Sequence, residues 1–171
     1  MAHIISVVNQ KGGVGKTTTT LNLAAFLADA GKLVLLVDLD PQANATSGLG
    51  LDHRELRAGV YEGLIGSHAL ERLMHETEHE GLKVLPATQA RAGASVELVN
   101  AEQREHCLRK ALMTVRNDFD YILIDNPPSL GMLTLNGLVA ADSVLIPVQA
   151  EYYALEGLSQ LLNTVNLVKE N

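Results

Sequence analysis

Short apolar runs recur along this chain and are separated by stretches of mixed polarity. Five of them are rich in Val, Ile and Leu: residues 4–8, 33–38, 83–86, 121–125 and 144–148. Three of the five are apolar almost throughout, which is typical of strands buried on both faces of a parallel sheet. We therefore expect these runs to be the strands at the centre of the fold.

The stretches between the runs repeat apolar residues with the period of an α-helix. Between residues 17 and 30, Leu and Ala recur at the i, i+3, i+4, i+7 spacing, and Gly31 is a natural stop. A similar repeat predicts a helix from about residue 95 to residue 116. Further helices are expected near residues 133–141 and 155–168.

Strands that alternate with helices imply right-handed βαβ units. The expected fold class is therefore α/β, with a mostly parallel sheet and helices on both of its faces. Residues 49–82 differ, because they mix Gly, His and Glu with short apolar pairs, and we expect short helices and loops at the rim there. The sequence contains no internal repeat or linker-like tract, so residues 1–171 are expected to form one domain.

Composition and charge narrow the classes of function. The net charge is −7, and an acidic chain is a poor candidate for binding nucleic acid over its whole surface. No apolar run reaches the roughly 20 residues of a membrane span, and no basic segment precedes an apolar stretch at the N-terminus. The single cysteine, Cys107, excludes a disulfide within one chain. We therefore expect a cytoplasmic protein that does not enter a membrane.

The strongest chemical signal is the segment NQKGGVGKTTTT, residues 9–20. It lies between an expected strand and an expected helix, and its glycines let the backbone take positive φ and form a nest of N–H groups for an anion. Lys16 would reach the β- and γ-phosphates of a nucleotide, the Thr17 hydroxyl would hold Mg²⁺, and Thr18 would bond an α-phosphate oxygen. The expected nucleotide-binding residues are Lys11, Gly12, Gly13, Val14, Gly15, Lys16, Thr17 and Thr18.

The same segment departs from the strict phosphate-loop pattern G-x-x-x-x-G-K-[ST], because Gln10 stands where the first glycine is required. It carries an additional lysine, Lys11, just before the glycine pair. An ammonium directed away from Lys16 would serve the nucleotide of a facing subunit, as an arginine finger does in trans. The other interpretation is a solvated lysine in an exposed loop, and the spacing alone leaves both open.

Three aspartates stand at or just after the ends of expected strands. Asp38 ends the second apolar run, Asp40 follows it in a loop, and Asp125 ends the run YILID. Ligands bind at the carboxyl ends of strands in open α/β sheets, and two carboxylates beside a triphosphate require a cation or an attacking water. Asp125 has the Walker B pattern, which meets Mg²⁺ through water. For Asp38 and Asp40, a simple strand-ending turn is the alternative.

Two other groups of residues are interpreted as solvated surface. His75 and His79 are spaced i, i+4, but the glutamates around them favour an exposed polar stretch over a zinc site. The basic residues between positions 104 and 116 do not share one helix face, and glutamates dilute them.

Four motifs, in this order, resemble one family: KGGVGKT (11–17), DLDPQANATSGLG (38–50), YILIDNPPSLG (121–131) and PVQAEYYALEGL (147–158). The first, with its leading lysine, is similar to the deviant Walker A motif of the ParA/MinD superfamily. The motif DLDPQANATSGLG resembles that of the ParA/Soj chromosome- and plasmid-partition ATPases. The resemblance covers most of the chain and implies a SIMIBI-like P-loop NTPase fold and an ATPase that binds ATP or ADP with Mg²⁺.

The resemblance also implies roles for individual residues. Lys11 would contact the nucleotide across a sandwich homodimer that forms with ATP. Asp40 would position the attacking water on the switch I loop, and Asp38 would help to hold the water shell of the metal. The catalytic residues are then Lys11, Lys16 and Asp40, and the metal-site residues are Thr17, Asp38 and Asp125.

Partners follow from the same resemblance. Such proteins bind nucleoid DNA without sequence preference, and a ParB-like protein stimulates their turnover. Relatives usually continue beyond the position of Asn171, so the DNA-binding residues are expected in a region absent here. A nucleotide-gated module that positions another cargo, with little turnover of its own, is the alternative function. A MinD-like membrane switch is disfavoured, because the last residues supply a single lysine.

Overall fold

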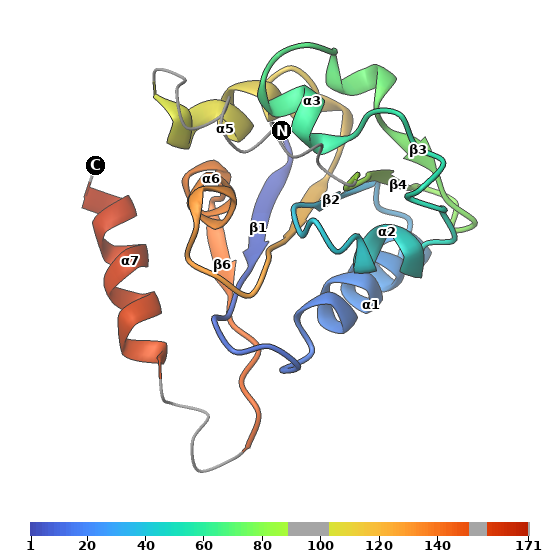
Figure 1. Ribbon diagram of the computed structural model, residues 1–171. Coiled ribbons are helices and arrows are strands. Elements are labelled where there is room, and N and C mark those ends of the chain that lie inside the picture. The colour runs from blue at the N-terminus through green and yellow to red at the C-terminus, as the bar shows by residue number, and fades with distance from the viewer. Residues whose placement is uncertain (89–102, 151–156, 171) are drawn as a thin grey trace.

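Six strands form one sheet at the centre of the computed structural model, which describes residues 1–88, 103–150 and 157–170 (Figure 1). The strand order is β3-β4-β2-β5-β1-β6, and neighbouring strands are parallel except for β3 and β4. The α/β class and the mostly parallel sheet expected from the apolar runs are confirmed. The bounds are β1 His3–Val7, β2 Val34–Asp38, β3 His75–Glu76, β4 Leu82–Leu85, β5 Tyr121–Asp125 and β6 Ser143–Leu145.

Helices cover both faces of this sheet (Figure 1). On one face α1 and α2 share a buried cluster with side chains of β2, β4 and β5. On the other face the cluster contains side chains of α3, α5 and α6, and α7 packs against α6. Among the described residues, none of these helices is long and apolar enough to cross a membrane. Their bounds are α1 Lys16–Asp29, α2 Asn44–Gly48, α3 Val60–Leu64, α5 Cys107–Leu112, α6 Met132–Ala140 and α7 Leu158–Glu170.

The parallel register brings acidic residues together at one edge of the sheet. Every residue of β2 is buried, as an almost continuously apolar strand requires. The β2–β5 register pairs Asp38 with Asp125, and the β1–β5 register pairs Val7 with Asp125. The loop that follows β1 therefore starts beside two carboxylates, at the edge where open α/β sheets bind ligands.

The helix expected to reach residue 116 ends at Leu112 instead. The Thr114 hydroxyl donates to the backbone oxygen of Ala111 at 2.8 Å, and the chain turns so that Ala2 N–H donates to the backbone oxygen of Arg116 at 2.8 Å. Val115 is still buried, in agreement with the apolar repeat. The expected first part of this helix, residues 95–102, lies outside the described residues.

Two further boundaries differ from the expectation. Within residues 49–82 the structure contains the strand β3, which pairs antiparallel with β4 and is too short to show a two-residue period. The strand β6 ends at Leu145 rather than at Val148, because Pro147 has no N–H for a ladder. The expected start of the last helix, at residue 155, lies outside the described residues.

Candidate phosphate-binding site

The glycine-rich loop joins the end of β1 to the start of α1. Gly13 and Gly15 take φ values of +72° and +87°, which residues with a Cβ rarely adopt. Gly15 is also the N-cap of α1, so the positive end of the helix faces the loop. A cavity of about 350 Å³ opens there and is lined by Gly12, Gly13, Gly15, Lys16, Thr17, Thr18, Asp40, Gln42, Asn44 and Pro128.

Lys16 is buried at this cavity. Its ammonium donates to the backbone oxygen of Lys11 at 3.3 Å, across the loop. Burial lowers the pKa of Lys16, and the carboxylates of Asp125 and Asp40 oppose that change. A desolvated ammonium at a helix N-terminus favours a polyanion, because the ligand's charge replaces the hydration that burial removes.

Asp125 is fully buried and accepts hydrogen bonds from two hydroxyls of α1. Thr17 Oγ1 donates to Asp125 Oδ2 at 2.7 Å, and Thr20 Oγ1 donates to Asp125 Oδ1 at 3.1 Å. Burial raises the pKa of Asp125, and both hydroxyl bonds oppose that rise. A hydroxyl that donates its proton to a carboxylate keeps its oxygen lone pairs for a cation, and Mg²⁺ prefers such oxygen ligands. Thr17 and Asp125 therefore fit a magnesium ion beside the loop.

Asp38 is fully buried, and residues of the loop after β2 and of the helix α2 engage both of its oxygens. Asp38 Oδ2 accepts from the N–H and the hydroxyl of Thr46, at 2.8 and 2.7 Å, and Oδ1 accepts from the N–H of Asp40 at 3.1 Å. The Thr46 hydroxyl oxygen accepts in turn from the N–H of Ala87 at 3.0 Å. Burial raises the pKa of Asp38 to about 6 in spite of these bonds. Asp38 thus holds the loop that carries Asp40 and does not line the cavity itself.

The segment after β2 lines the cavity with three polar residues: Asp40 and Gln42 from the loop, and Asn44, the first residue of α2. Asp40 Oδ1 accepts from the N–H of Gln42 at 3.0 Å, and Ala43 takes a left-handed φ of 54°. This turn leaves Asp40 close enough to Lys16 for its charge to oppose the lowering of the Lys16 pKa by burial. Sequence reasoning missed Gln42 and Asn44 as cavity residues, although both belong to the motif quoted for this loop, because a loop has no period that indicates side-chain direction.

Asn126, to which the sequence assigned no role, connects the ends of two central strands. It is buried, and its Nδ2 donates to Ser6 Oγ at 2.8 Å and to the backbone oxygen of Val7 at 2.9 Å. Gly137 of α6 lies so close that an added Cβ would stand 2.2 Å from Asn126 Oδ1. Asn126 therefore ties the strand that bears Asp125 to the strand that begins the loop.

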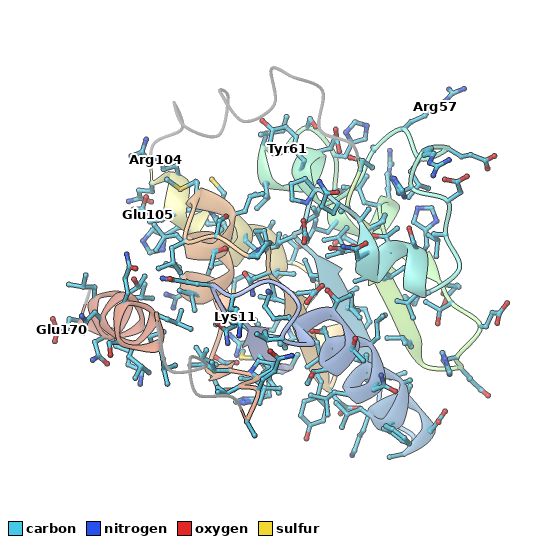
Figure 2. All side chains as sticks on the ribbon, turned by 60° about the horizontal axis from the view of Figure 1, so that its bottom comes forward. Lys11, Arg57, Tyr61, Arg104, Glu105 and Glu170 are labelled. Atoms are coloured by element: carbon cyan, nitrogen blue, oxygen red, sulfur yellow. The ribbon has the colours of Figure 1, made fainter. Side chains whose placement is uncertain are left out.

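The residues expected to bind nucleotide are not all equivalent in the structure. The cavity is surrounded by three of the loop glycines, by Lys16, Thr17 and Thr18, and by Asp40. Val14 is buried and contributes nothing to the lining, while Lys11 is partly exposed and also lies outside it. Figure 2 shows Lys11 on the loop between β1 and α1. Thr20 and Thr46, which hold Asp125 and Asp38, were missed, although Thr20 lies three residues after Thr17 on the same helix.

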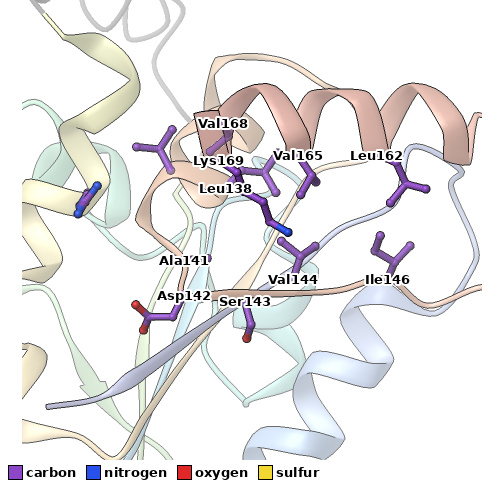
Figure 3. A pocket seen from close by; sticks show the side chains of 12 residues that line it. Leu138, Ala141, Asp142, Ser143, Val144, Ile146, Leu162, Val165, Val168 and Lys169 are labelled. Carbon is purple, nitrogen blue, oxygen red and sulfur yellow. The ribbon is translucent and has the colours of Figure 1, made fainter. Parts of the chain in front are cut away.

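Another cavity, of about 470 Å³, lies between α6, β6 and α7 (Figure 3). Its lining is largely aliphatic and includes no glycine nest, so it does not fit the phosphates of a nucleotide. In the described ranges, no three His, Cys, Asp or Glu side chains converge to hold a metal. The pair His75 and His79 therefore lacks a third such ligand within those ranges.

Sequence comparison relates the chain to proteins of known description. A family model described as an AAA domain matches residues 2–171. The chromosome partitioning protein ParA of Myxococcus xanthus is 57% identical over 170 residues, which are 99% of this chain and 60% of that protein. The sporulation initiation inhibitor protein Soj of Bacillus subtilis is 57% identical over 171 residues, which are 100% of this chain and 68% of that protein.

Solved structures agree with this relation. Cobyrinic acid a,c-diamide synthase from Mycobacterium smegmatis, with bound ATP analogue and magnesium, has a TM-score of 0.95 and 44% identity, over 99% of this chain and 69% of that one. A plasmid partition protein from Borrelia burgdorferi has a TM-score of 0.82 and 29% identity, over 98% of this chain and 73% of that one. The expected P-loop NTPase fold is confirmed.

Proposed function

This chain belongs to the ParA/Soj family of partition ATPases, and from that membership we propose that it binds ATP with Mg²⁺ and hydrolyses it. The observation that carries the proposal is the meeting of the phosphate loop, Lys16, Thr17 and Asp125 at one edge of the sheet. The synthase structures with bound ATP analogue and with bound ADP, both with magnesium, support the choice of ligands. The chain spans 60% and 68% of two partition relatives, so the activity of a whole protein is part of the proposal.

The loop N–H groups and Lys16 hold the β- and γ-phosphates. Lys16 exchanges its bond to the Lys11 backbone oxygen for phosphate oxygens, and the exchange is favourable because a buried ammonium gains a charged partner. Thr18, in the first turn of α1, donates to the α-phosphate.

Thr17 and Asp125 would hold Mg²⁺ beside the phosphates. Asp38 would support this metal site, and it keeps the switch I loop in place through Thr46 and Asp40. When bound, Mg²⁺ neutralises charge on the phosphoryl oxygens.

Asp40 positions the water that attacks the γ-phosphorus, and the bond to the β–γ bridging oxygen breaks to give ADP and phosphate. Lys11 of a second copy completes the site, in an ATP-bound sandwich homodimer. Its own position supports this role, because Lys11 is partly exposed and lies outside the lining of its own cavity. Across the dimer its ammonium stabilises charge that develops in the transition state.

We further propose that the ATP-bound dimer acts in the cytoplasm in the segregation of DNA, with a ParB-like protein that stimulates hydrolysis. The names of the partition relatives support this process. Non-specific DNA contacts belong, in this proposal, to the part of the relatives that the chain does not span. No membrane is involved.

Nucleotide affinity, ATP turnover and mass in solution test the proposal. Lys16→Ala is expected to abolish nucleotide binding, because it removes the ammonium from the loop. Asp40→Ala is expected to bind ATP and accumulate as the ATP dimer, because only the water-positioning step is lost. Full turnover by Asp40→Ala would remove Asp40 from its role. ATP binding without phosphate release in a single turnover, with and without a ParB-like protein, would instead favour a nucleotide-gated module that positions another cargo.

A further inference from the structure

Residues 145–149, here called the backing segment, run along the phosphate loop and are bound to it at three points. Val8 N–H donates to the backbone oxygen of Leu145 at 3.0 Å. Asn9 Nδ2 donates to the backbone oxygen of Pro147 at 2.8 Å, and Gln149 Nε2 donates to the backbone oxygen of Gly13 at 3.2 Å. The backing segment therefore follows the loop from its beginning to Gly13, one of the three glycines that line the cavity.

The bond from Gln149 constrains a peptide group of the loop. The Gly13–Val14 peptide is trans, so its carbonyl and its N–H point in opposite directions. Gly13 lines the cavity and Gln149 does not, so the carbonyl oxygen that Gln149 holds faces away from the cavity. The N–H of Val14 then lies on the side of this peptide opposite to Gln149, although Val14 itself is not among the residues that line the cavity.

This peptide would otherwise have considerable freedom. The plane of this peptide is set by ψ of Gly13 and φ of Val14, and a glycine has no Cβ that would restrict its ψ, so nothing in the chemistry of Gly13 fixes the plane. On the far side, the buried Val14 side chain limits rotation but makes no hydrogen bond that selects one orientation. The hydrogen bond that Gln149 donates to the Gly13 oxygen selects one orientation of this peptide.

Asn9 and Pro147 explain how Gln149 reaches the loop. Pro147 ends the β6 ladder and fixes its own φ, which directs the chain away from the sheet. Asn9 then holds the Pro147 oxygen with its amide nitrogen and accepts the Lys11 N–H with its amide oxygen, at 3.1 Å. Asn9 thus joins the backing segment, at Pro147, to the start of the loop. Two residues further along the backing segment, Gln149 contacts the centre of the loop at Gly13.

We propose that Gln149 is a positioning residue for phosphate binding, which holds the Gly13–Val14 peptide so that the Val14 N–H points at the β-phosphate of a nucleoside di- or triphosphate. The inference rests on the proposed nucleotide binding and adds a residue from outside the loop. Because ADP and ATP share the β-phosphate, loss of Gln149 weakens both by a similar factor. A residue that acted only on the γ-phosphate would weaken ATP alone.

The test compares Gln149→Ala and Gln149→Leu with the wild-type chain. The leucine is similar in size and uncharged but has no N–H to donate, and Gln160→Ala, on the exposed face of α7, is the matched control. Calorimetric titration with MgADP and with a non-hydrolysable MgATP analogue gives the affinities. Both Gln149 variants are expected to bind each nucleotide about 2- to 10-fold more weakly, the value of one neutral hydrogen bond. The control is expected to bind as the wild type does.

Two further readouts separate positioning from a general loss of structure. The melting temperature without nucleotide is expected to stay unchanged, because Gln149 is partly exposed, while the amide resonance of Val14 is expected to move. Wild-type affinity in both Gln149 variants, or weaker binding with an unmoved Val14 resonance, would overturn the inference and leave the proposed function standing. Failure of the wild-type chain to bind either nucleotide would overturn both.

Discussion

Replacing Thr46 by valine tests how the switch I loop is held. The substitution keeps the shape of the side chain and removes the hydroxyl that donates to Asp38 at 2.7 Å and accepts from Ala87 at 3.0 Å. A hydrogen bond to a charged group contributes about 1.5–3 kcal/mol, and a buried N–H without an acceptor costs about 1–3 kcal/mol. Because one hydroxyl makes both bonds, we expect the free energy of unfolding to fall by about 2–4 kcal/mol at pH 8.

The pKa of Asp38 makes this loss depend on pH. Burial raises the pKa from its ordinary 3.8 to about 6, so the folded state binds more protons than the unfolded state between these values. Asp38 therefore destabilises the fold as the pH rises through this window, by about 3 kcal/mol in the wild type. The Thr46 hydroxyl lowers the pKa of Asp38, so removing this hydroxyl raises that pKa further. The stability that is lost as Asp38 ionises is then lost up to a higher pH.

Urea unfolding in EDTA without nucleotide, at pH 4.5 and at pH 8, measures both effects. We expect the difference between wild type and Thr46→Val to be larger at pH 8, where Asp38 is ionised. Thr164→Val is the matched control, because its hydroxyl donates only within α7 and its loss should cost less than about 0.5 kcal/mol. The reasoning would be refuted if Thr46→Val lowered the free energy of unfolding as little as the control does. It would also be refuted if Thr46→Val lowered it equally at both pH values.

Three further predictions concern other parts of the molecule. Gly137→Ala places a Cβ 2.2 Å from Asn126 Oδ1 and is expected to destabilise the fold by about 1–3 kcal/mol in thermal unfolding; an unchanged melting temperature would contradict the contact. Asp125→Asn is expected to weaken MgATP binding by about 10-fold or more and not to weaken metal-free ATP binding, because a carboxylate beside a triphosphate is repulsive without the cation, as titration with and without EDTA would show. Arg116→Ala removes the bonds to Asp142 at 2.6 Å and to the Ala2 backbone oxygen at 3.1 Å, and chemical unfolding should show a loss of about 1 kcal/mol.

The central strands were predictable because burial on both faces leaves a continuous apolar run. The strand Tyr121–Asp125 has the bounds that its sequence predicts, and α1 begins and ends within one residue of the expected helix. Short or irregular elements could not be predicted in the same way. The two residues of β3 are too few for a period, and the chain after Leu112 turns because of contacts with Ala2, far away in the sequence.

The phosphate loop and its aspartates were visible as candidates because a glycine nest, a lysine and strand-ending acids occur at fixed spacings. The residues that hold the loop and the aspartates in place could not be predicted, because these residues contact partners that are distant in the chain. Thr46 reaches Ala87 across 41 positions, and Gln149 reaches Gly13 across 136. A single sequence has no signal for such pairs. Asp38 also shows this limit, because its position at a strand end did not reveal that its oxygens are engaged by Thr46 and Asp40.

Mixing two inactive variants tests most directly whether Lys11 acts on a second copy. In a mixed dimer of Lys11→Ala and Asp40→Ala, one site combines an intact Asp40 with an intact Lys11 from its partner. If Lys11 acts across the dimer, a one-to-one mixture recovers about a quarter of the wild-type ATP turnover, because half of the dimers are mixed and each has one complete site. If Lys11 serves the nucleotide of its own chain, every protomer lacks one residue, and the mixture stays as inactive as either variant alone.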